Sequence, residues 1–166
     1  MMNKVLCSLL LFLSISCGLQ GRNANYARDS KRIWLDSKEI HHGEYVWKMK
    51  KAGDVISSAE KVSTLGYDTS DWLSAIVPGT VLNSLVYNKE YPEPYYGVNN
   101  KLESGKIPDI SKVGREFYTY WFRTEFDVPE SFAGKTIWLQ PDGVNYRAEI
   151  WVNGNLLSTL NGMFIS

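Results

Sequence analysis

Residues 142–154 read Asp-Gly-Val-Asn-Tyr-Arg-Ala-Glu-Ile-Trp-Val-Asn-Gly, and this run combines a turn, an alternating strand and a hairpin signal. From residue 146 the side chains alternate between two faces, which is the pattern of a half-buried strand. The face predicted to point inward carries Tyr146, Ala148, Ile150 and Val152. Asn153-Gly154 suits the two positive-φ positions of a type I′ turn, and leucines follow it, so we expect a second strand that folds back on the first.

The first half of the chain predicts further strands and one short helix. Residues 44–50 alternate, with Tyr45, Trp47 and Met49 inward, and residues 33–35 could form an earlier strand. Residues 72–77 predict a strand that ends at Pro78-Gly79. Thr80 is then a suitable N-cap for a helix of about two turns, whose apolar positions are Val81, Leu82, Leu85 and Val86.

The second half of the chain begins with a predicted loop at 88–114, which holds three prolines and little periodicity. Strands are predicted at 117–127 and 136–140, and Asn161-Gly162 predicts a turn after the closing hairpin. Closely spaced strands with a single short helix predict an all-β fold, an antiparallel sandwich.

Three motifs carry a family resemblance. Residues 77–82, 118–126 and 142–154 resemble, in this order, the N-terminal sugar-binding domain of glycoside hydrolase family 2. The loop at 93–99, Glu-Pro-Tyr-Tyr-Gly-Val-Asn, is most similar to the β-mannosidase and exo-β-glucosaminidase members, and the resemblance spans about residues 45–166. It implies a galactose-binding-domain-like jelly roll that precedes an immunoglobulin-like domain and a catalytic barrel.

The predicted strands are fewer than the eight or so of a jelly roll. The fold therefore looks incomplete at its C-terminus, and two interpretations stay open. Either the chain is a fragment that stops before the barrel, or an N-terminal segment supplies the last strand.

The N-terminal residues predict export. Lys4 precedes an apolar run that is too short to span a bilayer, so residues 1–16 read as a signal peptide. Ser14-Ile15-Ser16-Cys17 resembles a bacterial lipobox, which predicts a lipoprotein anchored to a membrane of the cell envelope through Cys17; plain secretion is the alternative. Residues 17–32 then form a tether, and the domain occupies 33–166.

Composition argues against several other classes of function. Cys7 would be removed with the signal and Cys17 acylated, which leaves no thiol for a disulfide, a zinc site or a nucleophile. His41 and His42 are adjacent and would point to opposite faces of a strand, so we predict no metal site, and no cofactor. Eighteen basic and eighteen acidic residues balance, and no basic stripe predicts a nucleic-acid partner.

The resemblance assigns no catalytic residue to this chain, because family 2 enzymes carry both catalytic carboxylates on the barrel. It implies instead that a loop of this domain reaches the sugar, with Tyr95 and Tyr96 stacking and Asn99 and Asn100 forming hydrogen bonds. Alternatively, the tyrosines plug the end of the sandwich. Asn161 lies near a sugar-binding position of galactosidase members, but Gly162 stands where they have a carboxylate, which argues against a cation and a galactose preference.

We expect the sugar-binding domain of a family 2 exo-β-glycosidase of the mannosidase, glucosaminidase or galactosidase type, without its barrel and so without activity of its own. A stand-alone lipid-anchored glycan-binding protein is the alternative. A third possibility is a protein-interaction module that uses the face the barrel would cover.

Overall fold

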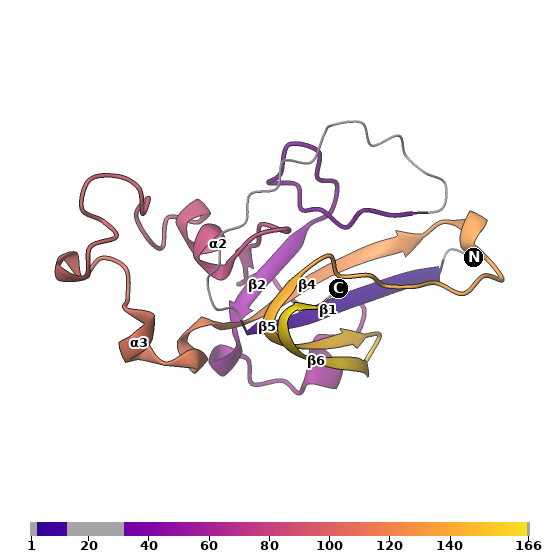
Figure 1. Ribbon diagram of the computed structural model, residues 1–166. Helices are drawn as coiled ribbons and strands as arrows, with labels where there is room; N and C mark the ends of the chain where they lie inside the picture. Colours follow the sequence, from indigo (N-terminus) through magenta and orange to yellow (C-terminus); the bar gives the residue numbers. More distant parts are fainter. Residues whose placement is uncertain (1–2, 13–31, 166) are drawn as a thin grey trace.

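A computed structural model describes residues 3–12 and 32–165 of the chain. Its fold is all-β with antiparallel strand pairing, as predicted, and the strands of this part form one sheet in the order β3-β2-β4-β1-β5-β6 (Figure 1). Their bounds are β1 Asn3–Phe12, β2 Trp47–Lys51, β3 Leu73–Ser74, β4 Thr119–Val128, β5 Val144–Val152 and β6 Asn155–Ile165. Within the described residues, three short α-helices accompany the sheet: α1 Ala59–Val62, α2 Val81–Tyr87 and α3 Ile110–Val113.

Helix α2 begins where the sequence predicts it. The Thr80 side-chain oxygen accepts a hydrogen bond from the backbone N–H of Asn83 at 3.0 Å, so one of the free donors at the helix start is satisfied. Val81 and Leu85, one helical turn apart, are both buried. The short helix therefore gains its stability from packing on the sheet more than from its own length.

The predicted hairpin is confirmed. Asn153 and Gly154 have φ of 49° and 83°, as a tight primed turn requires, and β5 and β6 pair on either side of them. The turn predicted at Asn161-Gly162 is wrong, because β6 continues through both residues. Gly162, opposite Tyr146, lies beside a shift in register and has a φ of 150°, so the glycine accommodates an irregularity in the strand and does not end it.

Other predicted strands are shorter or absent. Residues 136–140 form no strand, and Trp138 in this segment is 86% exposed. Of the strand predicted at 72–77, only β3 forms. Residues 33–35 form no strand, but the Leu35 carbonyl accepts a hydrogen bond from the Trp47 indole at 2.6 Å. Alternating side chains make a segment suited to a strand, but a neighbouring strand has to provide the partner groups.

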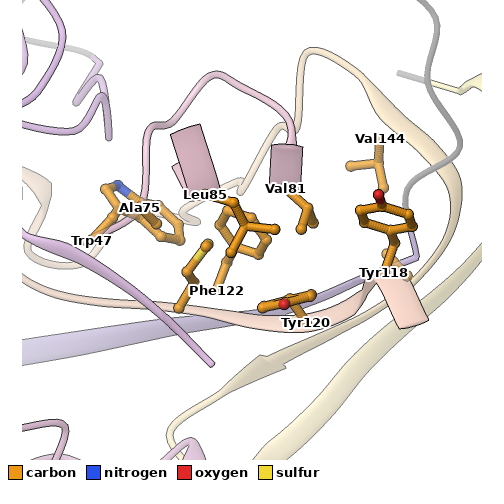
Figure 2. Packing of buried hydrophobic residues seen from close by; sticks show 10 residues of the cluster. Trp47, Ala75, Val81, Leu85, Tyr118, Tyr120, Phe122 and Val144 are labelled. Atoms are coloured by element: carbon orange, nitrogen blue, oxygen red, sulfur yellow. The ribbon is translucent and has the colours of Figure 1, made fainter. Parts of the chain in front are cut away.

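The larger hydrophobic core lies between α2 and the sheet. Figure 2 shows Val81 and Leu85 of α2 above Tyr120 and Phe122 of β4. Trp47 and Met49 of β2 join this cluster as predicted, together with Ala75, Tyr118, Val144 and Ala148. Ala148 and Ile150 of β5 are buried as the alternation predicts, and Val152 is half-buried. The inward position predicted for Tyr146 is wrong: this ring is 47% exposed, beside the irregular pairing of β5 with β6.

A second core covers the opposite face. Trp121 and Trp151 pack there with Val62 of α1 and with Trp72. Trp121 is a neighbour of Tyr120 along β4, so alternation sends the two rings to different faces. Trp151 is predicted to point away from Ile150. Its partners, Val62, Trp72 and Trp121, belong to this chain, and together they cover this face of the sheet.

Strand β1 occupies the middle of the sheet, between β4 and β5 (Figure 1). It comes from the segment predicted to be a signal peptide, and it pairs antiparallel with both neighbours. An N-terminal segment thus supplies a central strand, which is one of the two interpretations that the sequence left open. Cys17 and nearly all of the predicted tether lie outside the described residues.

Candidate functional site: an anchored loop with two exposed tyrosines

The segment between α2 and β4 contains four of the five predicted sugar-contact residues. It projects beyond the sheet as a long excursion that carries α3 (Figure 1), as the predicted loop at 88–114 requires. A 3-10 turn at Leu102–Ser104 and α3 itself give it some internal structure. Loops of this length in compact domains commonly bind ligands.

Both ends of this loop are fastened to the sheet domain. At the start, the Asn88 amide donates to the carbonyls of Ser74 at 2.8 Å and Ser84 at 2.6 Å, and the Ser74 N–H donates back to Asn88 Oδ1 at 3.3 Å. At the end, the Tyr118 hydroxyl donates to the Pro108 carbonyl at 3.4 Å. Tyr118 belongs to the larger core, and its burial raises the pKa of its hydroxyl.

Asn99 holds the middle of the loop together. It is 7% exposed, and its amide donates to the Glu93 carbonyl at 2.9 Å, while its Oδ1 accepts from Lys106 Nζ at 2.9 Å. The Ser104 hydroxyl donates to the Asn99 carbonyl at 3.1 Å. The side chain is thus engaged in shaping the loop, and its contact with a sugar stays a prediction.

Tyr95 and Tyr96 lie at the outer part of the loop, 85% and 77% exposed. The Tyr96 N–H donates to the Glu93 carbonyl at 3.2 Å, and the Asn99 N–H donates to the Tyr96 carbonyl at 3.2 Å, so the backbone between them forms consecutive turns. Neither ring covers the core, which disfavours the alternative that they plug the end of the sandwich. Asn100 is also exposed and follows directly after the buried Asn99.

Asn161 lies elsewhere, on β6 at the edge of the sheet. The register runs from Asn161 through Arg147 of β5 and Phe12 of β1 to Thr119 of β4, where the loop ends. Three strand spacings of about 4.8 Å separate the Cα atoms of Asn161 and Thr119 by about 14 Å. The structure therefore does not place Asn161 next to the end of the loop.

The sequence reasoning missed a polar depression of about 440 Å³ beside the second core. It is lined by Val46, Lys48, Gly66, Tyr67, Asp68, Thr69, Ser70, Arg123, Thr124 and Glu125. Arg123, 5% exposed, donates to the carbonyls of Val62 at 3.0 Å and Thr64 at 2.9 Å and forms an ion pair with Glu125. A basic residue inside the apolar run of β4 was the available signal, but its contacts serve to fasten α1 to the sheet.

Two side chains of the loop, Asp109 and Tyr91, have pKa values shifted by their surroundings. Hydrogen bonds from the Ser111 hydroxyl and N–H to the Asp109 carboxylate lower the pKa of that group, which caps α3. Burial raises the pKa of Tyr91, which packs against the larger core.

Over residues 3–12 and 32–165, no three His, Cys, Asp or Glu side chains gather in a way that could hold a metal ion. In the same ranges no helix combines the length and apolar composition needed to cross a membrane.

Residues 47–166 match the family described as glycosyl hydrolase 2 galactose-binding domain-like. The chain belongs to this family. The match begins at the first residue of β2 and includes the loop with both tyrosines. A galactose-binding domain-like fold is an all-β sandwich, in agreement with the predicted fold class.

Curated relatives of this family 2 domain are glycosidases. The chain is 41% identical over 96 residues to a mannosylglycoprotein endo-β-mannosidase of Lilium longiflorum, covering 58% of this chain and 10% of that protein. It is 28% identical over 112 residues to an exo-β-D-glucosaminidase of Amycolatopsis orientalis, covering 66% and 10%, and 31% identical over 121 residues to β-mannosidase B of Aspergillus terreus, covering 72% and 12%. The chain thus spans about a tenth of the length of these relatives. No solved structure matches it.

Proposed function

We propose that this domain faces the carbohydrate in a larger family 2 exo-β-glycosidase, and that Tyr95 and Tyr96 contact the sugar. The observation that carries the proposal is the pair of adjacent exposed tyrosines on a loop fastened at both ends and in its middle. Asn100, exposed beside them, supplies a hydrogen-bonding amide for sugar hydroxyls.

The physical argument concerns preorganisation. Exposed aromatic rings offer flat apolar faces to the C–H groups of a sugar ring, and their hydroxyls offer hydrogen bonds. A loop that is already ordered gives up less conformational entropy on binding than a mobile one. The names of the reported relatives make β-linked mannose and glucosamine the first sugars to test, and galactose is third because the family resemblance includes galactosidase members.

Titration of the purified chain with mannose, glucosamine and galactose oligosaccharides, followed by calorimetry or NMR, tests the sugar contact. We expect weak binding of one class, reduced at least tenfold, or about 1.4 kcal/mol, by Tyr95→Ala or Tyr96→Ala. Tyr87→Ala is the matched control, because Tyr87 is an exposed tyrosine outside the loop. The contact is refuted if all three variants bind alike.

We also propose that residues 1–16 direct export and that Cys17 carries the lipid anchor. The support is the order of Lys4, an apolar run and Ser-Ile-Ser-Cys, which supplies an export signal followed by an acylation site. In a bacterial host, Cys17→Ala should move the protein from the membrane to the soluble fraction. If the variant stays in the membrane fraction as before, the anchor is elsewhere, and if the unmodified chain is already soluble outside the cell, the secretion alternative holds.

A further inference from the structure

The place of β1 in the sheet divides the remaining strands into two groups. On one side β4 continues to β2 and β3, and on the other β5 continues to β6. β1 pairs with β4 along its whole length, from Asn3 opposite Val128 to Phe12 opposite Thr119. It pairs with β5 from Cys7 opposite Val152 to Phe12 opposite Arg147. Without β1, the facing edges of β4 and β5 lose their backbone partners, and no other strand of the described chain joins the two groups.

The strand that fills this position has to be apolar on both faces at one end. Residues 119–124 of β4 are all buried, because one core lies on each face of the sheet there. A strand buried on both sides reads as a continuous apolar run and not as an alternation. Residues 7–12, Cys-Ser-Leu-Leu-Leu-Phe, stand opposite this buried half of β4, and the last four of them form a continuous apolar run.

The other end of β1 matches the polarity of the β4 residues opposite it. Glu125 and Asp127 of β4 are exposed, and the register sets Lys4 opposite Asp127. A lysine at a position opposite an aspartate favours this antiparallel register over one shifted by a residue, since opposite charges across strands are stabilising. The composition of the segment thus matches β4 at the apolar end, residues 9–12, and at Lys4.

We propose that the space between β4 and β5 is a strand-acceptor site, and that its occupant is Asn3–Phe12 of the unprocessed chain. Such a site binds through backbone hydrogen bonds to both edges and through apolar side chains above and below the sheet. Cleavage after Ser16 would remove the occupant, so folding of this domain around its N-terminus and processing of that terminus exclude each other. The proposal does not depend on sugar binding, and it concerns the chain before the cleavage that the lipid anchor requires.

A disulfide between β1 and β5 tests the register. Directly opposed residues of antiparallel strands have Cα atoms about 4.5–5.5 Å apart, within the range of about 4.4–6.8 Å that a disulfide spans. Cys7 stands opposite Val152, so Val152→Cys in a Cys17→Ser background should form an intramolecular disulfide with Cys7 under mild oxidation. The unprocessed chain is made by cell-free synthesis without added membranes. Its intact mass then shows that residues 1–16 are present.

Asn155→Cys is the matched control for this cross-link. Asn155 stands opposite Val152 on β6, one strand farther from Cys7, which puts the two Cα atoms about 10 Å apart and beyond disulfide reach. We expect most of the Val152→Cys protein and little of the Asn155→Cys protein to cross-link. Equal yields in the two variants, or no cross-link in either, overturn the proposal.

A proline in β1 gives a second, independent test. Leu10 pairs with Trp121 of β4 and Glu149 of β5, and proline at this position removes a backbone donor from a central strand. In the full chain, Leu10→Pro should lower the urea midpoint of unfolding clearly, whereas Ser14→Pro, just beyond β1, should leave it unchanged. Midpoints that do not differ between the two variants would mean that β1 does not complete the sheet.

Discussion

At the scale of single residues, Arg123 is a buried charged side chain that directly follows three buried aromatic residues of β4. Its guanidinium reaches across the end of α1 to two backbone carbonyls and lies 5.8 Å from the ring centre of Tyr67. The carbonyls that end a helix have no partner within it, so a buried arginine can satisfy them. One side chain thereby connects β4, α1 and the segment after α1.

Replacing Arg123 by methionine keeps most of the apolar stem and removes these hydrogen bonds. We expect a loss of about 2–4 kcal/mol in the free energy of unfolding, because the Val62 and Thr64 carbonyls lose their charged donor in a buried place. Lys50→Met is the contrast, since Lys50 forms an exposed ion pair with Asp71, and exposed pairs contribute little. Urea unfolding measures the free energy of unfolding of both variants. If both lose a similar small amount, Arg123 does not fasten α1 to the sheet.

Tyr120 makes the domain less stable as the pH becomes alkaline. Burial raises the pKa of its hydroxyl to about 12 from the usual 10.0. Because the folded state holds the proton more tightly, this contribution is complete below pH 10 and is lost as the pH rises from 10 towards 12. Over that interval the free energy of unfolding should fall by about 2–3 kcal/mol from this group alone.

Tyr120→Phe should flatten this alkaline decrease, since phenylalanine has no proton to lose. Chemical unfolding at a series of pH values from 8 to 11 measures the slope for both proteins. Tyr91 and Tyr118, whose pKa values are also raised by burial, leave a smaller slope in the variant. Identical slopes in the two proteins would show that Tyr120 ionises as freely in the folded domain as in the unfolded chain.

At the scale of elements, the β5–β6 turn is tied to a helix on the neighbouring face. The Gly154 N–H donates to the Ser63 carbonyl, just beyond α1, at 3.1 Å. Gly154 also requires a φ of 83°, which L-residues with a side chain adopt only at a cost. Gly154 therefore serves both the geometry of the turn and the contact with the residue after α1.

Gly154→Ala should destabilise the domain by about 1–2 kcal/mol, chiefly through this backbone strain. A Cβ at position 154 would meet its nearest atom, the Glu60 carbonyl oxygen, at 3.5 Å, so a steric clash adds little. Gly53→Ala is the control, because a Cβ there meets nothing within 4 Å and its φ is not positive. Thermal unfolding of the two variants compares them directly, and equal midpoints would contradict the strain argument.

At the scale of the whole molecule, this family 2 domain comprises about a tenth of the length of its glycosidase relatives. Retaining glycosidases need two carboxyl groups about 5 Å apart on either side of the scissile bond. The resemblance puts both on a barrel that these 166 residues do not include.

The purified chain should therefore not hydrolyse aryl β-mannosides, β-glucosaminides or β-galactosides. Release of the coloured aryl alcohol is the measurement, and heat-killed protein gives the background. A commercial glycosidase added to the same mixture shows that the assay works. Turnover above background in protein free of host enzymes would place catalytic carboxylates within this chain, against the family resemblance.

The sequence by itself determined the features that depend on neighbours along the chain. The all-β class, the hairpin turn at Asn153-Gly154 and the Thr80 cap of α2 follow from local backbone preference and side-chain alternation. So do the inward positions of Trp47 and Met49 on β2 and of Ala148 and Ile150 on β5, but not that of Tyr146. The exposed tyrosine loop was also identified from sequence, because prolines and lost periodicity mark such segments. Its contact with a sugar rests on the resemblance.

Only the tertiary structure decided which segments become strands and which partners they have. Residues 136–140 have the composition of a strand yet are irregular, while Asn3–Phe12, which reads as an export signal, becomes the central one. Likewise Asn99 proved to be a buried support of the loop, and Arg123 a fastening for α1. The physical reason is that a strand or a buried polar group is stabilised by partners distant in sequence, and local patterning does not encode which of them is available.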